Sequence, residues 1–387
     1  MDRPRIYLSV PHMNGLERGF VEQAFESNWL STVGPNLSAF EAEMSDKLNG
    51  LSTLAVSSGT AALHLVLRAA GVGPGDSVAL STLTFAGSLY PILYLGAQPV
   101  FIDSERESWN MDPGLLEEHL RHAAGINRLP KAVIVVHLYG QHADLDVIDG
   151  ICKRYEVTLI EDAAESLGAT YKGRPTATTG THSILSFNGN KIITTTGGGM
   201  VVSKDPAAVQ RMRKWANQSR EPALEYLHTE LGYNYRMSNV LAGIGRGQLQ
   251  TLEQRVGQRR EVFRRYQAAF ADLDALIPQP EAAWGTHTRW LSVFTVKSDS
   301  VELNSTGLIN SLGQAGIEAR PVWRPMHTQP LTSEAETVGG SVGDDLYRTG
   351  VCLPSSSSLT NLEQDEVVGA VRDYFVGALR RSKAGTA

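Results

Sequence analysis

Short apolar segments alternate with helical segments from Leu54 to about Met212, and this alternation restricts the fold more than any other feature. Strands that are apolar on both faces need cover on both faces, which a parallel or mixed sheet obtains from its connecting helices. The pattern therefore predicts an α/β domain in which helices cover both faces of the sheet. The predicted strands are Ser77–Leu80, Pro99–Asp103, Lys131–Leu138, Val157–Ile160, Ser183–Phe187 and Met200–Ser203.

The pattern changes after a long helix predicted over residues 248–273. A strand at 290–296, a helix near 305–315 and a proline-rich segment at 320–330 indicate a smaller α+β domain. We place the boundary so that residues 1–248 form the large domain and residues 249–387 the small one. Residues 331–345 are predicted to form a surface loop. The long helix also carries a run of cations, predicted to be a solvated face: Arg255, Arg259, Arg260, Arg264 and Arg265.

Charge and motif content argue against several classes of protein. The net charge of −6 gives no support for bulk binding to nucleic acid or to an anionic membrane. The glycine signatures of dinucleotide-binding and P-loop proteins are missing. Cys152 and Cys352 lie far apart without a metal-ligand pattern, so we predict buried free thiols and no metal site. Because no segment resembles a signal peptide or a membrane span, a cytoplasmic location is expected.

Lys191 ends the turn Asn188-Gly189-Asn190, between an apolar strand and three consecutive glycines. On these residues alone, a solvated turn lysine is the simpler interpretation. Two upstream segments change this interpretation. Asp162 follows an apolar strand, where the open end of a parallel sheet places ligands. Ser58-Gly59-Thr60 opens an alanine-rich helix, whose N-terminus suits a phosphate dianion.

An amine, an acid and a phosphate cradle are together what pyridoxal phosphate chemistry needs. Lys191 is the candidate for the amine that attaches the cofactor. Asp162 is the candidate acid, because an ionised carboxylate keeps a pyridine nitrogen protonated and so lets the ring accept electrons. His137, Tyr139 and His142 follow another strand end, where lining the site and serving as structural residues are both open.

These segments resemble the DegT/DnrJ/EryC1/StrS family of sugar aminotransferases, within the aspartate-aminotransferase superfamily. The resemblance covers nearly the whole chain. It implies a fold type I large domain with a mixed seven-stranded sheet, pyridoxal 5'-phosphate as cofactor, and a homodimer with shared active sites. The segments that carry it are NWLS with GP (28–31, 34–35), SGTAAL (58–63), TF (84–85), EDAA (161–164), SFNGNK (186–191), GGG (197–199) and GYNYRM (232–237).

The resemblance also implies site residues. Phe85 would stack on the pyridine ring, and Asn234 would reach the cofactor phosphate of the neighbouring subunit. Glu165 stands where the family more often has Gln or His, and a second carboxylate there is unfavourable unless it is protonated or turned away. The implied cofactor-binding residues are Ser58, Gly59, Thr60, Phe85, Asp162, Glu165, Ser186, Lys191 and Asn234. The implied substrate-binding residues are Trp29, Leu30, Ser31, Thr32, Arg320, Pro325, Met326 and His327, with Trp323 and Arg324 as further candidates.

Within the family, the chain is most similar to enzymes that aminate C4 of a UDP-linked 4-keto-6-deoxy-N-acetylhexosamine. The segments that carry this similarity are SFNGNKI with TGGGM, and RPVWRPMH at 320–327. The amino donor implied is L-glutamate, and the product would serve surface glycans. Amination at C3 and a dTDP-linked sugar are open alternatives. A non-catalytic regulatory role and a nicotinamide-dependent dehydrogenase represent two different classes of function. Lys191 and Asp162 argue against the regulatory role, and the missing fingerprint argues against the dehydrogenase.

Overall fold

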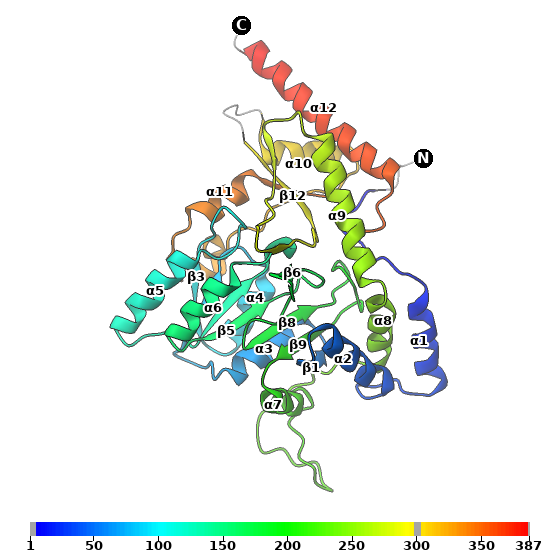
Figure 1. The fold of residues 1–387 in the computed structure, drawn as a ribbon, viewed down its shortest axis with the longest axis vertical. Helices are drawn as coiled ribbons and strands as arrows, with labels where there is room; N and C mark the ends of the chain where they lie inside the picture. Colours follow the sequence, from blue (N-terminus) through cyan, green and yellow to red (C-terminus); the bar gives the residue numbers. More distant parts are fainter. Residues whose placement is uncertain (1–4, 298–302, 386–387) are drawn as a thin grey trace.

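A mixed sheet at the centre of the large domain organises the protein. The computed structural model describes residues 5–297 and 303–385 (Figure 1). Strands β1, β9 and β8 pair antiparallel and the other neighbours pair parallel, which confirms the predicted α/β class. In spatial order the eight strands are β1 (Ser52–Val56), β9 (Gly199–Ser203), β8 (His182–Ser186), β5 (Thr158–Asp162), β4 (Ala132–Val136), β2 (Ser77–Ser81), β3 (Gln98–Ile102) and β14 (Glu336–Val338).

Helices cover both faces of this sheet because successive strand residues point to opposite sides. Ile134 packs in a core with helices α3, α4 and α7, whereas Val133 and Val135 pack in a core with α5 and α6. Helices α2 and α8 cover the β1–β9 end of the second face. The large-domain helices are α1 (Leu16–Glu26), α2 (Pro35–Lys47), α3 (Gly59–Ala69), α4 (Ala86–Tyr94), α5 (Pro113–Gly125), α6 (Leu145–Arg154), α7 (Pro206–Ala216) and α8 (Asn239–Leu249).

The small domain packs its own apolar core around Phe263, Phe294 and Val371 and lies above the large sheet in Figure 1. Its antiparallel sheet has the order β10 (Leu276–Pro278), β12 (Ser292–Val296), β15 (Gly350–Leu353), β13 (Arg320–Pro321). Its helices are α9 (Leu252–Ala269), α10 (Ser305–Gln314), α11 (Ser341–Thr349) and α12 (Asn361–Gly385). The remaining short elements are β6 (Thr170–Tyr171), β7 (Arg174–Pro175), β11 (Gly285–Thr286), and 3-10 turns at Leu138–Gly140, Met326–Thr328 and Pro330–Thr332. The boundary after residue 248 falls in the last turn of α8 and stays a prediction.

The prediction of a surface loop at 331–345 was wrong. This segment forms β14, which pairs parallel with β3 and makes the large sheet eight-stranded rather than seven-stranded. The Asp103 carboxylate then accepts hydrogen bonds from the amides of Gly340, Val342 and Gly343 at 2.7–3.0 Å, which fixes the start of α11. A three-residue strand is too short to show a periodic pattern, so only its distant pairing partner defines it.

The interpretation of the arginine run as a solvated face was also wrong in part. Arg255 and Arg259 are 3% and 1% exposed, whereas Arg264 is exposed. Positions four residues apart lie on the same face of a helix, and here that face of α9 packs inward. The predicted long helix is also interrupted, because α8 ends at Leu249 and α9 begins at Leu252.

Cys152 and Cys352 are buried free thiols, as predicted. In the part of the chain that the structure describes, no helix is long and apolar enough to span a bilayer.

Candidate active site

A pocket of about 430 Å³ opens where parallel strands of the large sheet end. Val136, Asp162 and Ser186, the last residues of β4, β5 and β8, all line it. This is the sheet edge at which α/β proteins bind ligands. The pocket brings together eight of the nine predicted cofactor-binding residues: Ser58, Gly59, Thr60, Phe85, Asp162, Glu165, Ser186 and Lys191.

The Asp162 carboxylate is buried and held in one orientation. Its Oδ2 accepts a hydrogen bond of 2.6 Å from the Ser88 hydroxyl, and its Oδ1 accepts one of 3.1 Å from the Ala164 amide. The Ser88 hydroxyl in turn contacts that of Thr84 at 2.6 Å. Ser88 therefore orients the predicted acid, a role that the sequence did not reveal because nothing distinguishes Ser88 from an ordinary helix serine.

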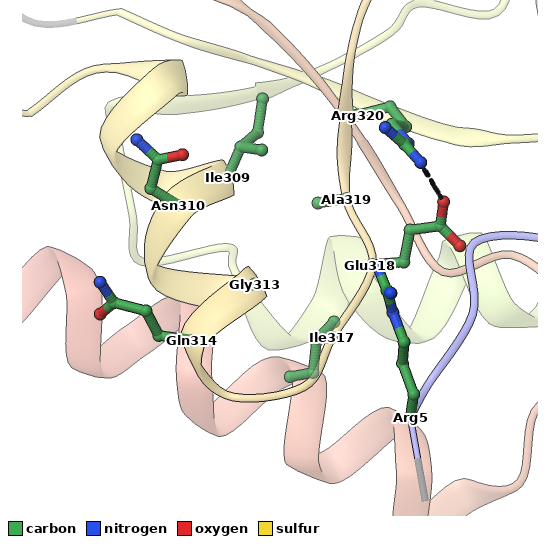
Figure 2. A pocket seen from close by; sticks show the side chains of 9 residues that line it. All are labelled: Arg5, Ile309, Asn310, Gly313, Gln314, Ile317, Glu318, Ala319 and Arg320. Carbon is green, nitrogen blue, oxygen red and sulfur yellow. Dashed lines mark hydrogen bonds and ion pairs between the residues drawn. The ribbon is translucent and has the colours of Figure 1, made fainter.

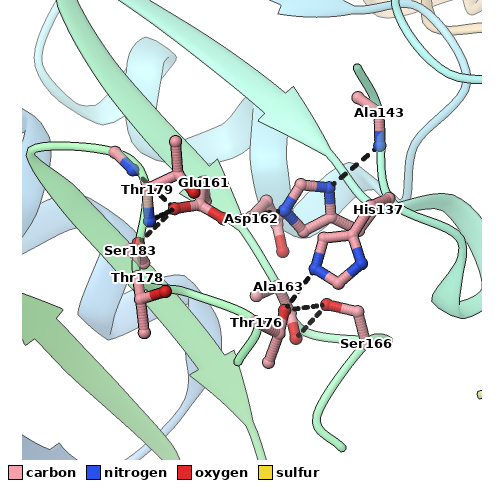
Figure 3. A network of polar contacts seen from close by, with 12 residues as sticks. His137, Ala143, Glu161, Asp162, Ala163, Ser166, Thr176, Thr178, Thr179 and Ser183 are labelled. Carbon is pink, nitrogen blue, oxygen red and sulfur yellow. Dashed lines mark hydrogen bonds and ion pairs between the residues drawn. The ribbon is translucent and has the colours of Figure 1, made fainter. Parts of the chain in front are cut away.

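Glu161 faces the opposite side of the sheet from Asp162, because adjacent strand residues alternate. Its carboxylate accepts hydrogen bonds from the amides of Thr179 and Gly180 and lies 2.9 Å from Nε2 of His137 (Figure 3). Burial acts to raise the pKa of Glu161, but the hydrogen bond and charge of His137, with the Gly180 amide, outweigh it and lower the pKa to about 2. Glu161 is thus a fixed internal anion beneath the pocket.

His137 and His142 belong to this buried network and do not line the pocket. Their ring centroids are 4.4 Å apart, and both side chains are fully buried. Burial lowers the pKa of His142 well below its ordinary value, with the charge of His137 acting in the same direction. The sequence left open whether these histidines line the site or are structural, and this geometry supports the structural role.

The N-terminus of α3 forms a cradle of small residues. Ser58 is the N-cap, and its Oγ accepts a hydrogen bond of 3.0 Å from the Ala61 amide. A Cβ at Gly199 would lie 2.3 Å from the carbonyl carbon of Ser58, so only glycine lets β9 approach this closely. Ser186 also lies against Gly59. Hydroxyls beside free amides at a helix N-terminus fit the phosphate of pyridoxal phosphate.

Lys191 points into the pocket from the turn after β8. Its Nζ lies 3.5 Å from Oε1 of Glu165 and 3.9 Å from the centroid of the Trp290 ring. The lysine side chain is 12% exposed. Trp290 was predicted only as the start of a strand, and no local pattern pointed to this contact. An amine on a short turn, an oriented acid and a phosphate cradle in one pocket fit the cofactor.

Comparisons with known proteins agree with this chemistry. Residues 12–372 match the DegT/DnrJ/EryC1/StrS aminotransferase family. The chain belongs to this family. It is 48% identical over 375 residues to EpsN of Bacillus subtilis (strain 168), whose name places it among the pyridoxal phosphate-dependent aminotransferases, and 96% of each chain is covered. It is 35% identical over 377 residues to the GDP-perosamine synthase of Caulobacter vibrioides, covering 97% of this chain and 100% of that one. The crystal structure of the aminotransferase TlmJ from Streptoalloteichus hindustanus superposes with a TM-score of 0.87 at 28% identity, covering 96% and 99% of the two chains.

As a member of the DegT/DnrJ/EryC1/StrS family, the protein is a pyridoxal 5'-phosphate-dependent sugar aminotransferase of fold type I. When bound, the cofactor supplies an aldehyde that captures amines and a ring that accepts electrons. Ser58, Thr60 and Ser186, which would hold its phosphate, and Lys191, which would attach it, all line the pocket, and these roles stay predictions. Phe85 is 59% exposed and lines the same pocket, so its ring is free to stack.

Glu165 is the departure from the family pattern, and its surroundings raise its pKa above the ordinary value. Oε2 accepts a hydrogen bond of 2.7 Å from the Tyr139 amide. Burial raises the pKa of Glu165, and the opposing charge of Lys191 reverses this only in part. A protonated carboxyl can donate a hydrogen bond as a glutamine amide does, so a raised pKa weakens the objection to a second carboxylate beside the ring hydroxyl.

Glu165→Gln is therefore expected to stabilise the cofactor-free protein at neutral pH. Because the folded-state pKa is raised, the stabilising contribution of Glu165 is present below its ordinary pKa of 4.5 and is lost as the pH rises through the folded-state value. Thermal unfolding at several pH values should show a higher midpoint for the variant near pH 7 and no difference near pH 4. Glu165→Ala, which leaves the Tyr139 amide without its acceptor, should lower the free energy of unfolding by about 1–3 kcal/mol. Equal pH dependence in wild type and Glu165→Gln would contradict the assignment.

The predicted residues Trp29, Leu30, Ser31, Thr32 and Asn234 do not line the pocket of their own chain. The turn at 29–32 lies between α1 and α2, where Asn239 donates to the Trp29 carbonyl at 3.0 Å. Asn234 is exposed beyond α7. Their assignments stay predictions.

The predicted substrate residues at 320–327 are dispersed. Arg320 pairs with Glu318 at 2.8 Å and lines a separate hollow of about 510 Å³ on the small domain (Figure 2). His327 contacts the Thr82 hydroxyl at 2.6 Å, and Pro325 and Met326 are buried. Trp323 alone of this segment lines the pocket, where its Nε1 has no hydrogen-bond partner among the described residues. The structure thus supports Trp323 best, and the others stay predictions.

Proposed function

We propose that the enzyme transfers an amino group from L-glutamate to the C4 ketone of a UDP-linked 4-keto-6-deoxy-N-acetylhexosamine, for surface glycan biosynthesis. The supporting observation is that one pocket holds Lys191, Asp162 and the α3 cradle, in a chain that belongs to a sugar aminotransferase family. The motif similarity at 186–192 and 196–200 supports the choice of sugar.

Lys191 is the proposed proton carrier. With pyridoxal phosphate bound, the amine of glutamate would first displace Lys191, and the freed lysine amine would then take the proton from the α-carbon of glutamate and return it to the cofactor. The keto acid then leaves, and the same lysine handles the reverse proton movement when the keto sugar accepts the nitrogen. One base serving two half-reactions is a ping-pong scheme. The Trp290 face and the Glu165 carboxyl lie beside the amine and would orient it.

The proposed homodimer is supported by exposed apolar side chains near the pocket and on the loop after α7. This loop extends away from the body of the subunit in Figure 1. Asn234, which lies outside its own pocket, would complete the site of the partner. The mass of the native protein by light scattering tests this, because a monomer would leave the shared site unsupported. The exposed side chains are Phe85, Tyr90, Tyr94, Leu224, Tyr226 and Leu231.

A GDP-linked keto sugar is the second candidate substrate, because the chain is 35% identical to a GDP-perosamine synthase. A dTDP-linked sugar and amination at C3 are further candidates, because the same lysine, acid and phosphate cradle would serve them. The dispersed positions of Arg320 and His327 provide no group that selects one nucleotide over another.

Incubation of the purified enzyme with pyridoxal phosphate, glutamate and a panel of UDP-, GDP- and dTDP-linked keto sugars tests the proposal. We expect a visible absorption band from lysine-bound cofactor, its loss on adding glutamate, and amination of the UDP-linked N-acetylhexosamine at C4, detected by mass spectrometry and NMR. Preferred amination of the GDP-linked sugar would overturn the choice of nucleotide. Absence of the band and of turnover would favour a non-catalytic role.

We also propose a cytoplasmic location, which is consistent with two buried cysteines that remain free thiols. Cell fractionation with an antibody to the protein tests it, and recovery outside the cytoplasm would contradict it.

A further inference from the structure

We propose that Arg259, a buried arginine of the small domain, positions the peptide group that carries Lys191 and is thus a positioning residue for the aminotransferase reaction. This role rests on the proposed function, because it assumes that Lys191 is the reacting amine. The proposal depends on three observations. Arg259 is buried without a carboxylate partner, it binds neutral groups, and two of those groups donate to the same carbonyl oxygen.

Arg259 is 1% exposed, and all its hydrogen bonds go to neutral groups. Nη1 donates to the carbonyl of Trp290 at 2.6 Å and to that of Ser355 at 2.9 Å, and Nη2 donates to the Ser9 hydroxyl at 3.1 Å. Among the side chains that the structure describes, no carboxylate lies within ion-pairing distance. Burial lowers the pKa of this guanidinium, and the neighbouring Arg255 adds to the effect. Burying a cation without a carboxylate partner is unfavourable, and the three hydrogen-bond acceptors compensate for this cost. They therefore constrain the position of the Arg259 guanidinium.

Two of the groups held by Arg259 donate to one acceptor, the carbonyl oxygen of Asn190. The Ser9 hydroxyl donates to it at 2.8 Å, and Nε1 of Trp290 donates to it at 2.8 Å. Arg259 binds the oxygen of Ser9 and the backbone of Trp290. It therefore constrains the positions of both donors at once, from a helix that makes no hydrogen bond to the turn at 188–191.

The Asn190 carbonyl and the Lys191 amide belong to one planar peptide group. The amide end of this plane donates to the carbonyl of Asn188 at 3.0 Å. The carbonyl end accepts from Ser9 and Trp290. With both ends held, the plane resists rotation, and the position of the Lys191 Cα atom, from which the side chain starts, is held with it. The Trp290 ring also lies 3.9 Å from the lysine Nζ, so Arg259 constrains both the base and the tip of this side chain.

A base that transfers a proton between two nearby carbons must keep its position within a fraction of an ångström. The simpler alternative is that Arg259 only joins three segments of the fold: the N-terminal segment, the turn before β12 and the turn after β15. A structural role predicts lower stability without a selective effect on Lys191. A positioning role predicts that the 188–191 turn loosens while the rest of the protein stays protected.

Arg259→Met and Arg255→Met are a matched pair for the test. Arg255 lies one turn earlier on α9, is 3% exposed, and binds His12 and Gln258 without contacting Ser9, Trp290 or Asn190. Hydrogen–deuterium exchange of the cofactor-free proteins should show faster exchange at 188–193 in Arg259→Met, by about tenfold, and a smaller change in Arg255→Met. In the loaded enzyme, the first-order rate at saturating glutamate should fall roughly 10–100-fold in Arg259→Met, with KM for glutamate changing less.

Ser9→Ala and Trp290→Phe keep the test decisive if Arg259→Met does not fold. Each removes one donor to the Asn190 carbonyl, and Trp290→Phe keeps an aromatic face beside Lys191. Intermediate increases in exchange at 188–193 are expected from each, and a larger increase from the pair. Equal exchange and equal rates in Arg259→Met and Arg255→Met would overturn the positioning role. Failure of wild type to bind the cofactor would overturn the proposed function instead, and the exchange data on cofactor-free protein would still decide whether Arg259 fixes the turn.

Discussion

Lys191→Ala is expected to abolish transamination, with the rate of the glutamate half-reaction falling by about 10⁴-fold or more. A positioned general base contributes roughly 10²–10⁴-fold, and the attachment point of the cofactor is lost in addition. Among the described residues, no other lysine lines the pocket, so no neighbouring amine can substitute. Stopped-flow absorption with purified variant, pyridoxal phosphate and glutamate measures the rate, and the visible band of lysine-bound cofactor should be missing before glutamate is added.

Two further variants separate loss of the amine from general damage. Lys191→Arg keeps a cation beside Glu165 and Trp290 but has no amine able to attach the cofactor, so it should be as inactive as Lys191→Ala. Lys204→Ala removes a lysine that binds the Thr179 carbonyl outside the pocket and should keep the wild-type rate. Retention of the visible band in Lys191→Ala would show that another residue attaches the cofactor.

The sequence predicted the centre of the site because its parts follow from local pattern. Asp162 and Ser186 end strands, and Ser58 opens a helix after a strand, so any parallel arrangement of those strands brings the three to one edge. Ser88 and Trp290 were missed for a different reason. Both act through long-range contacts, Ser88 with Asp162, and Trp290 with Asn190 and Lys191, and such contacts leave no trace in the local pattern.

In α9 the helical spacing of buried residues was present in the sequence, but the number of arginines led to the prediction of a solvated face. Arg255 and Arg259 lie four residues apart, and Val262 and Tyr266 continue the same stripe toward the C-terminus of the helix. All four are buried. A helical periodicity taken across residue types, rather than over apolar residues only, would have placed the two arginines on the inner face. The β14 strand offered no such pattern, because three residues cannot define a period.

Asp162→Asn is expected to lower the glutamate half-reaction by about 10³-fold while leaving the lysine-bound cofactor band in place. The amide has nearly the shape of the carboxylate and can still accept from Ser88, but it carries no charge to favour a protonated ring nitrogen. Loss of one preorganised electrostatic group costs about 10²–10³-fold in rate. Single-turnover kinetics and the absorption spectrum, measured on the same sample, separate the rate from cofactor binding.

The contrast with Ser88→Ala and Glu165→Gln identifies which carboxyl group is the acid. Ser88→Ala keeps the charge of Asp162 and removes only its 2.6 Å hydrogen bond, so a loss of roughly tenfold is expected. Glu165→Gln keeps an acceptor for the Tyr139 amide and nearly the same shape, so it should retain most activity. If Asp162→Asn kept the wild-type rate while Glu165→Gln lost it, the acid would be Glu165. The backbone at the end of β5 is also held beneath Asp162, because the amide of His137 donates to the Asp162 carbonyl at 3.1 Å and the His137 ring lies 2.9 Å from the Glu161 carboxylate. This support keeps the end of β5 in place at the residue that we propose as the acid.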